Sequence, residues 1–296
     1  MNLRQLVCFL AVAEEASFTR GAERVGIAQP SLSQQIRGLE TELGGLLIER
    51  LPRGIALTPA GRAFLPEARA AVQAAERAAR SARSALGLDG GELAVATVRS
   101  VAIGILPTSL QRWHERNPGI SVRLHEYRHR RLLEEDVRRG VGDVAVGPRP
   151  ASWNGPLVSL GHERFVIVLS QTDELAGRKS VRLGELADRE WVLFEPGFGL
   201  AEVVAAACGR AGFQPRASVR TAQSEAAARL AAAGLGPALV PDNIVPPGLD
   251  ATVAGIDPPV TRELVAYTRV QWSPAARDFL ELLEQWDWAP APARRR

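Results

Sequence analysis

Residues 17–43 read SFTRGAERVGIAQPSLSQQIRGLETEL and predict two short helices joined by a tight turn. Ser17 can cap the first helix with its hydroxyl, and Gly26 supplies the turn. Pro30 fits the first position of the second helix, because its missing N–H would be unpaired there in any case. Apolar residues recur on one face of the first helix: Phe18, Ala22 and Val25. This arrangement is typical of a helix-turn-helix.

The second helix separates an apolar face from a polar one. Its apolar residues, spaced at i, i+4, i+7 and i+11, share a sector of roughly 60° and should pack on the rest of the domain: Leu32, Ile36, Leu39 and Leu43. The polar residues are Ser31, Ser33, Gln34, Arg37 and Thr41. Their side chains can bond base edges and phosphates, so this face suits the major groove of DNA. A solvated amphipathic helix in a small bundle is the alternative that this helix alone leaves open.

The flanking residues complete a small domain. Asn2 and Gln5 form a capping-box pattern, which predicts a preceding helix with an apolar stripe made of Leu3, Leu6, Val7, Leu10 and Ala13. After Gly44 and Gly45, residues 47–50 and 55–57 predict two short strands that form a wing. Arg50 and Arg53 could lie along a phosphate backbone or reach a minor groove, although such arginines are more often simply solvated.

Residues 1–61 therefore resemble the winged helix-turn-helix of LysR-type transcriptional regulators, in SFTRGAERVGIAQPSLSQQIRGLETELGGLLIER and in LTPAG. The resemblance implies a regulator that binds an inverted-repeat operator as a dimer or tetramer, with RNA polymerase as a candidate partner. The implied DNA contacts are Arg20, Gln29, Pro30, Ser31, Ser33, Gln34, Arg37, Arg50 and Arg53. Departures at Gly21, Ala28 and Ile48 predict reduced stability, since a lost helix cap costs about 1 kcal/mol.

Composition constrains the function less than these motifs do. The net charge is +3, yet residues 1–60 hold six arginines and six glutamates, so overall basicity is no argument for DNA binding. The N-terminus has no basic region followed by a long apolar run, and no segment approaches the roughly 20 apolar residues of a membrane span, so a cytoplasmic location is expected. Cys8 and Cys208 are interpreted as small core residues; a redox-sensing pair is the alternative, with nothing local to support it.

A long helix follows the wing. Thr58 and Pro59 begin it, and no glycine interrupts residues 62–86. Its apolar positions have the spacing of a coiled-coil seam and predict dimerisation: Leu65, Ala68, Val72, Ala75, Ala79, Ala82 and Leu86. Packing within one chain is the alternative. Pro66 predicts a kink near the start of this helix.

Beyond residues 87–91, strands and helices alternate, which predicts an α/β domain with a mostly parallel sheet. The fold expected by resemblance is an N-terminal winged helix-turn-helix, a linker helix and a two-subdomain, periplasmic-binding-protein-like α/β effector domain. The boundaries are residues 1–58 for DNA binding, 59–89 for the dimerisation helix and 90–290 for the effector domain. Its subdomain I spans about 91–160 and 264–290, subdomain II about 161–263, and a disordered tail covers 291–296.

The sequence HEYRH, from His125 to His129, matches the zinc-protease pattern H-E-x-x-H. That chemistry needs both histidines on one helix. Residues 120–125 alternate between apolar and polar, which indicates a strand, so no metal site is predicted. No catalytic motif appears elsewhere, and the protein is not expected to be an enzyme.

A small, anionic effector is expected in a cleft between the two subdomains. The resemblance and the strand ends indicate Arg99, Ser100, Arg128, His129, Gly147, Pro196, Gly197 and Phe198 as its contacts. Arginine can hold a carboxylate through two bonds, and EPGFG at 195–199 predicts free N–H groups at Gly197, Phe198 and Gly199 where a helix begins. Solvated charge and an ordinary turn are the alternatives.

No nucleotide or other cofactor is indicated. A DNA-binding architectural protein without an effector and, more remotely, a zinc metallopeptidase are the competing functions.

Overall fold

The computed structural model describes residues 1–51, 54–86 and 91–285. The chain divides into two units, Met1–Gly91 with Arg139–Val141, and Glu92–Arg138 with Gly142–Arg296. Each unit has its own hydrophobic core. In the part of the chain that the structure describes, we find no helix with both the length and the apolar character that a bilayer crossing requires.

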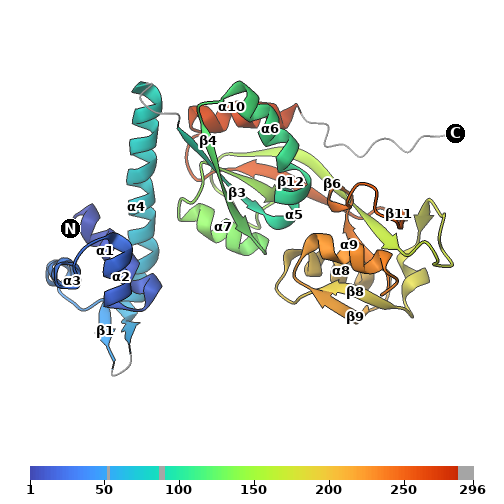
Figure 1. The fold of residues 1–296 in the computed structure, drawn as a ribbon, viewed down its shortest axis with the longest axis horizontal. Helices are drawn as coiled ribbons and strands as arrows, with labels where there is room; N and C mark the ends of the chain where they lie inside the picture. Colours follow the sequence, from blue (N-terminus) through green and yellow to red (C-terminus); the bar gives the residue numbers. More distant parts are fainter. Residues whose placement is uncertain (52–53, 87–90, 286–296) are drawn as a thin grey trace. The chain divides into compact units, whose positions relative to one another are not determined.

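The first unit contains three short helices, a two-stranded wing and one long helix (Figure 1): α1 Leu3–Glu15, α2 Phe18–Val25, α3 Gln29–Leu43, β1 Ile48–Arg50, β2 Ile55–Leu57 and α4 Pro59–Leu86. The predicted capping box is present, because the Asn2 side chain accepts from the Gln5 N–H at 3.0 Å and the Gln5 side chain accepts from the Asn2 N–H at 2.8 Å. Ser17 caps α2 as predicted, whereas Ala28 makes no side-chain cap of α3. Since α3 begins at Gln29, Pro30 occupies its second position rather than its first.

The core of this unit follows the predicted helix faces with two differences. Leu32, Ile36 and Leu39 are buried, but Leu43, the last residue of α3, is 45% exposed because the helix ends beyond the core. At Gly21, a Cβ atom would lie 3.0 Å from Cγ2 of Val12 in α1. Glycine therefore permits the close approach of α2 to α1, so Gly21 has a packing role beside its cost to the helix.

Helix α4 is continuous through Pro66. Its first half belongs to the core of its own unit, because Ala68 is buried and Leu65 and Val72 pack against the hydrophobic cluster that the short helices form. The predicted seam is thus an intrachain contact over this half. Ala79 and Ala82 further along are exposed, while the side chain of Leu86 is not among those described.

The second unit consists of two subdomains joined by long strands. Subdomain I contains β3 Glu92–Val98, α5 Arg99–Gly104, α6 Leu106–Arg116, β4 Ser121–Tyr127, α7 Arg130–Arg138, β5 Val144–Pro148 and α10 Pro274–Glu284. Subdomain II contains β7 Ser180–Val181, β8 Glu190–Phe194, α8 Gly199–Arg210, β9 Arg216–Thr221, α9 Ser224–Ala232, β10 Ala238–Pro241 and β11 Thr252–Ile256, with short 3-10 helices at Leu183–Leu186 and Asp242–Ile244. The joining strands are β6 Leu157–Leu169 and β12 Thr261–Tyr267.

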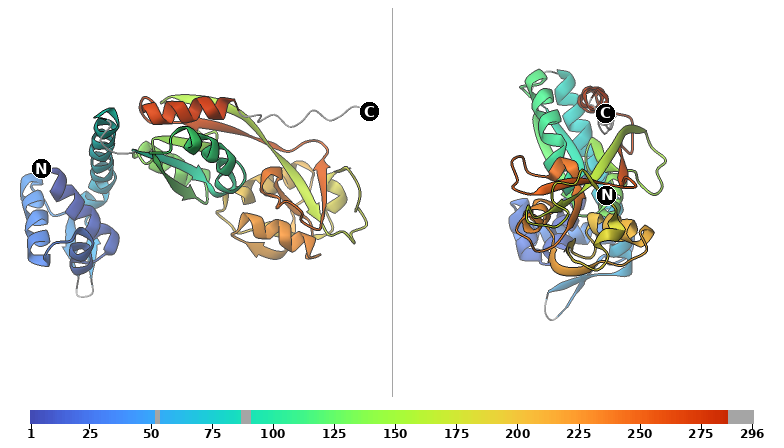
Figure 2. Two further views of the ribbon diagram at one scale, coloured as in Figure 1. Left: turned by 45° about the horizontal axis from the view of Figure 1, so that its top comes forward. Right: turned by 90° about the vertical axis from the view of Figure 1, so that its right-hand side faces the viewer.

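The main sheet is mixed rather than mostly parallel. Strand β3 runs parallel to β4 and β5, but β12 pairs antiparallel with both β5 and β6, and β10 and β11 pair antiparallel with β6. Strands β8 and β9 form a separate parallel pair. The difference arises because β6 carries the chain from one core to the other and β12 returns it in the opposite direction, side by side (Figure 2). Helix α5 and strands β7, β11 and β12 were not predicted.

Candidate functional site

The polar face of α3 is accessible. Ser31, Gln34 and Arg37 are exposed, while Leu32 and Leu39 across the helix are fully buried. Among the described residues, no ion-pair partner engages the Arg37 guanidinium. A hydroxyl, an amide and an unengaged guanidinium on one exposed helix face can form hydrogen bonds with phosphates and base edges.

Ser33 differs from the prediction that it faces a duplex, because it is only 5% exposed. It lies about 100° around the helix from Leu32, at the border of the apolar face, where packing covers it. The Gln29 side-chain amide donates to the Ser33 hydroxyl at 2.9 Å. Ser33 therefore orients Gln29, which is half-buried, and Pro30 beside it is exposed.

Of the remaining basic candidates in this unit, Arg20 is the one whose side chain the structure describes. Arg20 is exposed, and its guanidinium donates to the Glu15 carbonyl at 2.5 Å. Arg50 ends β1, but its side chain and all of Arg53 lie outside the described residues. The wing itself is present as predicted, with Ile48 opposite Leu57.

A small cavity of about 80 Å³ lies between the subdomains of the second unit. Its lining comes from the starts of α5 and α8, the loop after β4, and β12, and includes Arg99, Ser100, Arg128, Phe198, Glu202 and Arg262. Arg99 and Arg128 are exposed, and neither has an ion-pair partner among the described residues. The cavity therefore has two guanidinium groups at its boundary that an anion could engage.

A buried ion pair forms the base of this cavity. Arg262 donates from Nε to a Glu163 carboxylate oxygen at 2.9 Å and from Nη2 to the Ser100 hydroxyl at 3.1 Å. The Glu163 side chain is fully buried, and Asn243 donates to its other oxygen at 3.0 Å. Sequence reasoning missed Arg262, because Glu163 and Ser100 lie 99 and 162 residues away and no local pattern indicates such a pair. Ser100 is consequently fixed in orientation at the cavity.

Two hydrogen bonds bridge the cleft. The Gly199 N–H donates to the Arg128 carbonyl at 2.8 Å, and Nε2 of His129 lies 2.9 Å from a carboxylate oxygen of Glu202. The other ring nitrogen, Nδ1, accepts from the Arg131 N–H at 3.0 Å. Since Nδ1 is an acceptor, Nε2 carries the hydrogen and donates to Glu202. The two subdomains are thus held together at the start of α8.

These bonds correct the prediction of a free N–H cluster at the start of α8. The Phe198 N–H donates to the Glu195 carbonyl at 3.1 Å, and the Gly199 N–H is engaged by Arg128. Both groups are therefore unavailable to an anion in this arrangement. Pro196 and Gly197 are exposed.

A second cavity, of about 550 Å³, lies on the α7 side of the bridge and shares Arg128, Arg130 and Glu202 with the small one. His129 and Gly197 also line it. Gly147 was predicted to contact the effector. It is buried, and a Cβ atom there would lie 3.0 Å from Cδ2 of Leu133 in the core. Its closeness to Leu133 reflects helix packing rather than ligand contact.

The zinc interpretation of HEYRH is contradicted by the backbone. His125 belongs to strand β4, whereas His129 follows it in a loop and is already bonded to Glu202 and Arg131. Within residues 1–51, 54–86 and 91–285, no group of three or more potential metal-ligating side chains occurs. Strand geometry cannot bring the two imidazoles onto one metal as a helix does.

Comparisons with known proteins agree with this architecture. Residues 3–62 match the family described as bacterial regulatory helix-turn-helix protein, lysR family, and residues 87–288 match the LysR substrate binding domain. The chain is 34% identical to a probable hydrogen peroxide-inducible genes activator of Mycobacterium avium, over 81% of this chain and 78% of that protein. It is 31% identical to the transcriptional dual regulator GltC of Bacillus subtilis, over 96% and 97%. The structure of full-length CbnR complexed with its target DNA has a TM-score of 0.72 at 28% identity, over 96% of this chain and 99% of that one.

Proposed function

Because the chain belongs to the LysR family of transcriptional regulators, which join a DNA-binding helix-turn-helix to an effector-binding domain, we propose that α3 reads an inverted-repeat operator. The accessibility of Ser31, Gln34 and Arg37 is the observation that carries this proposal. The CbnR relative has been solved in complex with its target DNA, which supports DNA binding by this chain. Arg20, Gln29 and the wing are the accompanying contacts.

Arg37→Ala tests the DNA contact. The probe is a duplex selected by the wild-type protein from a random-sequence library. A specific base contact contributes about 1–3 kcal/mol, so the affinity should fall between about 5-fold and 150-fold. Arg277→Ala, an exposed arginine on α10, is the matched control and should leave the affinity unchanged. Equal affinities for the wild-type protein and Arg37→Ala would contradict the assignment.

The effector is proposed to be a small anion held in the cleft. Arg99 and Arg128 supply unengaged guanidinium groups, and Ser100 supplies a hydroxyl oriented by Arg262. The cavity of about 80 Å³ is too small for most metabolites, so binding at Arg99 and Ser100 inside it requires the bridge at Gly199 and His129 to open. An anion that engages Arg128 would favour one arrangement of the subdomains over the other, which couples its binding to DNA binding.

Thermal shift against a panel of mono- and dicarboxylates tests this effector class in the full chain. A carboxylate that raises the melting temperature by binding in the cleft should bind at least tenfold more weakly to Arg128→Ala and unchanged to Arg277→Ala. Glu202→Gln weakens the bridge and should strengthen binding of the same carboxylate. A panel without any stabilising anion would instead favour the architectural protein that functions without an effector.

Self-association is proposed through the distal half of α4. Ala79 and Ala82 are exposed and lie on the predicted seam, and small side chains allow close helix approach. A two-fold operator also requires a dimer, and dimers can pair into a tetramer. Ala82→Glu should shift the sedimentation coefficient toward the monomer, while Glu76→Gln, exposed on the same helix, should not.

A further inference from the structure

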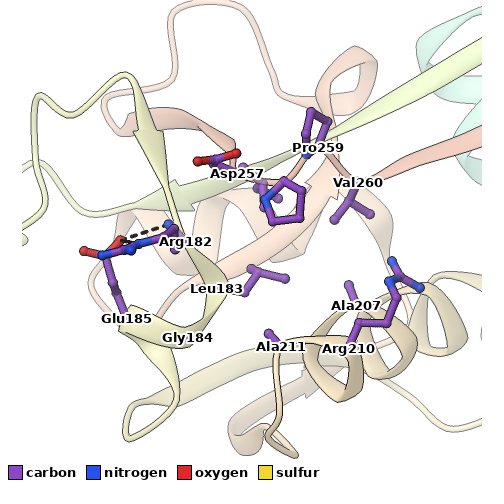
Figure 3. Close-up of a pocket in the computed structure, with 12 residues that line it drawn as sticks. Arg182, Leu183, Gly184, Glu185, Ala207, Arg210, Ala211, Asp257, Pro259 and Val260 are labelled. Carbon is purple, nitrogen blue, oxygen red and sulfur yellow. Dashed lines mark hydrogen bonds and ion pairs between the residues drawn. The ribbon is translucent and has the colours of Figure 1, made fainter.

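A cavity of about 460 Å³ opens in subdomain II, away from the interdomain cleft. It lies between the 3-10 helix at Leu183–Leu186, the carboxyl end of α8 and the segment that precedes β12 (Figure 3). None of its lining residues lines either cavity of the cleft region. Its volume falls within the range of small-molecule sites, about 300–1,000 Å³.

The walls of this cavity are mostly apolar. They consist of Leu183, Ala207, Ile256, Pro258, Pro259 and Val260. Leu183, Ala207 and Val260 belong to the core of the subdomain, so the cavity walls are fixed by packing. Such a surface favours an apolar ring or short chain, which removes its own apolar area from water on binding.

The charged groups at the rim of the cavity differ between its two sides. Glu185 accepts from the Arg182 N–H at 2.9 Å and from the Arg178 guanidinium at 2.7 Å, so its charge is compensated. Arg210, in the last turn of α8, is exposed and has no ion-pair partner among the described residues. In Figure 3, Arg210 and the Arg182–Glu185 pair lie on opposite sides of Leu183, with Asp257 away from Arg210.

We propose that this cavity is a second ligand site, which binds a small apolar carboxylate with its ring on Leu183 and Val260 and its carboxylate on Arg210. A basic side chain at a helix end is common on its own, because the helix dipole favours it. Here the guanidinium borders an apolar cavity of ligand size, and this combination determines the class of ligand. Asp257 repels a carboxylate from the other side, which sets a single orientation for the bound molecule.

Isothermal titration calorimetry of the full chain with 2-naphthoate tests the site. The wild-type protein should bind 2-naphthoate, and 2-naphthalenemethanol, which lacks the charge, should bind at least tenfold more weakly. Arg210→Met should weaken 2-naphthoate binding at least tenfold. Ala211→Trp fills the cavity from an exposed position and should abolish the binding. Arg229→Met, an exposed arginine on α9, is the matched control and should leave it unchanged.

The cleft variant Arg128→Ala separates this site from the proposed effector site. It should bind 2-naphthoate like the wild-type protein, because Arg128 does not line the cavity. Loss of binding in Arg128→Ala with full binding in Arg210→Met and Ala211→Trp would overturn the proposal and assign the ligand to the cleft. Absence of 2-naphthoate binding to the wild-type protein at millimolar concentration would overturn it as well. Circular dichroism confirms that each variant is folded before titration.

Discussion

Replacing Arg262 by methionine tests how much the ion pair with the buried Glu163 carboxylate contributes to the stability of the effector domain. The Glu163 side chain is fully buried and Arg262 is 14% exposed, so the substitution leaves a charge in the interior. Among the described residues, its remaining side-chain hydrogen bond comes from the Asn243 amide. Removing one partner of a buried ion pair costs about 3–5 kcal/mol. A domain of this size loses about 2–4 °C of melting temperature per kcal/mol. Multiplying these two ranges predicts that the melting temperature of the effector-domain transition falls by about 6–20 °C.

Differential scanning calorimetry of the full chain measures this shift. Arg164→Met is the matched control: Arg164 pairs with Asp242 at 3.1 Å, but their side chains are 41% and 33% exposed, and such pairs contribute about 0–1 kcal/mol. The double variant Glu163→Met with Arg262→Met should recover most of the loss, because no charge remains buried. If Arg262→Met shifted the melting temperature no more than Arg164→Met does, the reasoning about the buried charge would be refuted.

Three further outcomes are expected. Ala28→Ser supplies the cap that α3 lacks and should stabilise the DNA-binding unit by about 1 kcal/mol, measured by calorimetry; no gain would mean that the cap geometry is not reached. Burial raises the pKa of Cys208 to about 11, so iodoacetamide should alkylate it at pH 7.5 at least about 100-fold more slowly in the folded than in the unfolded protein; rapid alkylation would restore the redox-sensing alternative. The hydrogen bond from Arg149 lowers the pKa of Glu263 from 4.5 to about 2, so its contribution to stability is complete above pH 4.5 and is lost as the pH falls through 2. The melting temperatures of the wild-type protein and Glu263→Gln should therefore differ most near neutral pH and converge in acid; a difference independent of pH would contradict this.

The sequence alone determined the local architecture of the DNA-binding unit. Capping residues, glycines and apolar spacing act within a few residues, so the Asn2 capping box, the helix ends at Gly26 and Gly44, and the strand rather than helix at His125 were all predictable. The alternation of strands and helices likewise indicated an α/β domain.

Only the tertiary structure decided which side chains meet. Ser33 lies on the border of a helix face, and packing rather than periodicity buries it. The Arg262–Glu163 pair, the bridge from His129 to Glu202, and the cavity beside Arg210 join residues far apart along the chain. Periodicity describes which residues share a face of one helix or strand. The cleft, in contrast, forms where β6 and β12 join the two subdomain cores. No local sequence pattern indicates which residues become neighbours there.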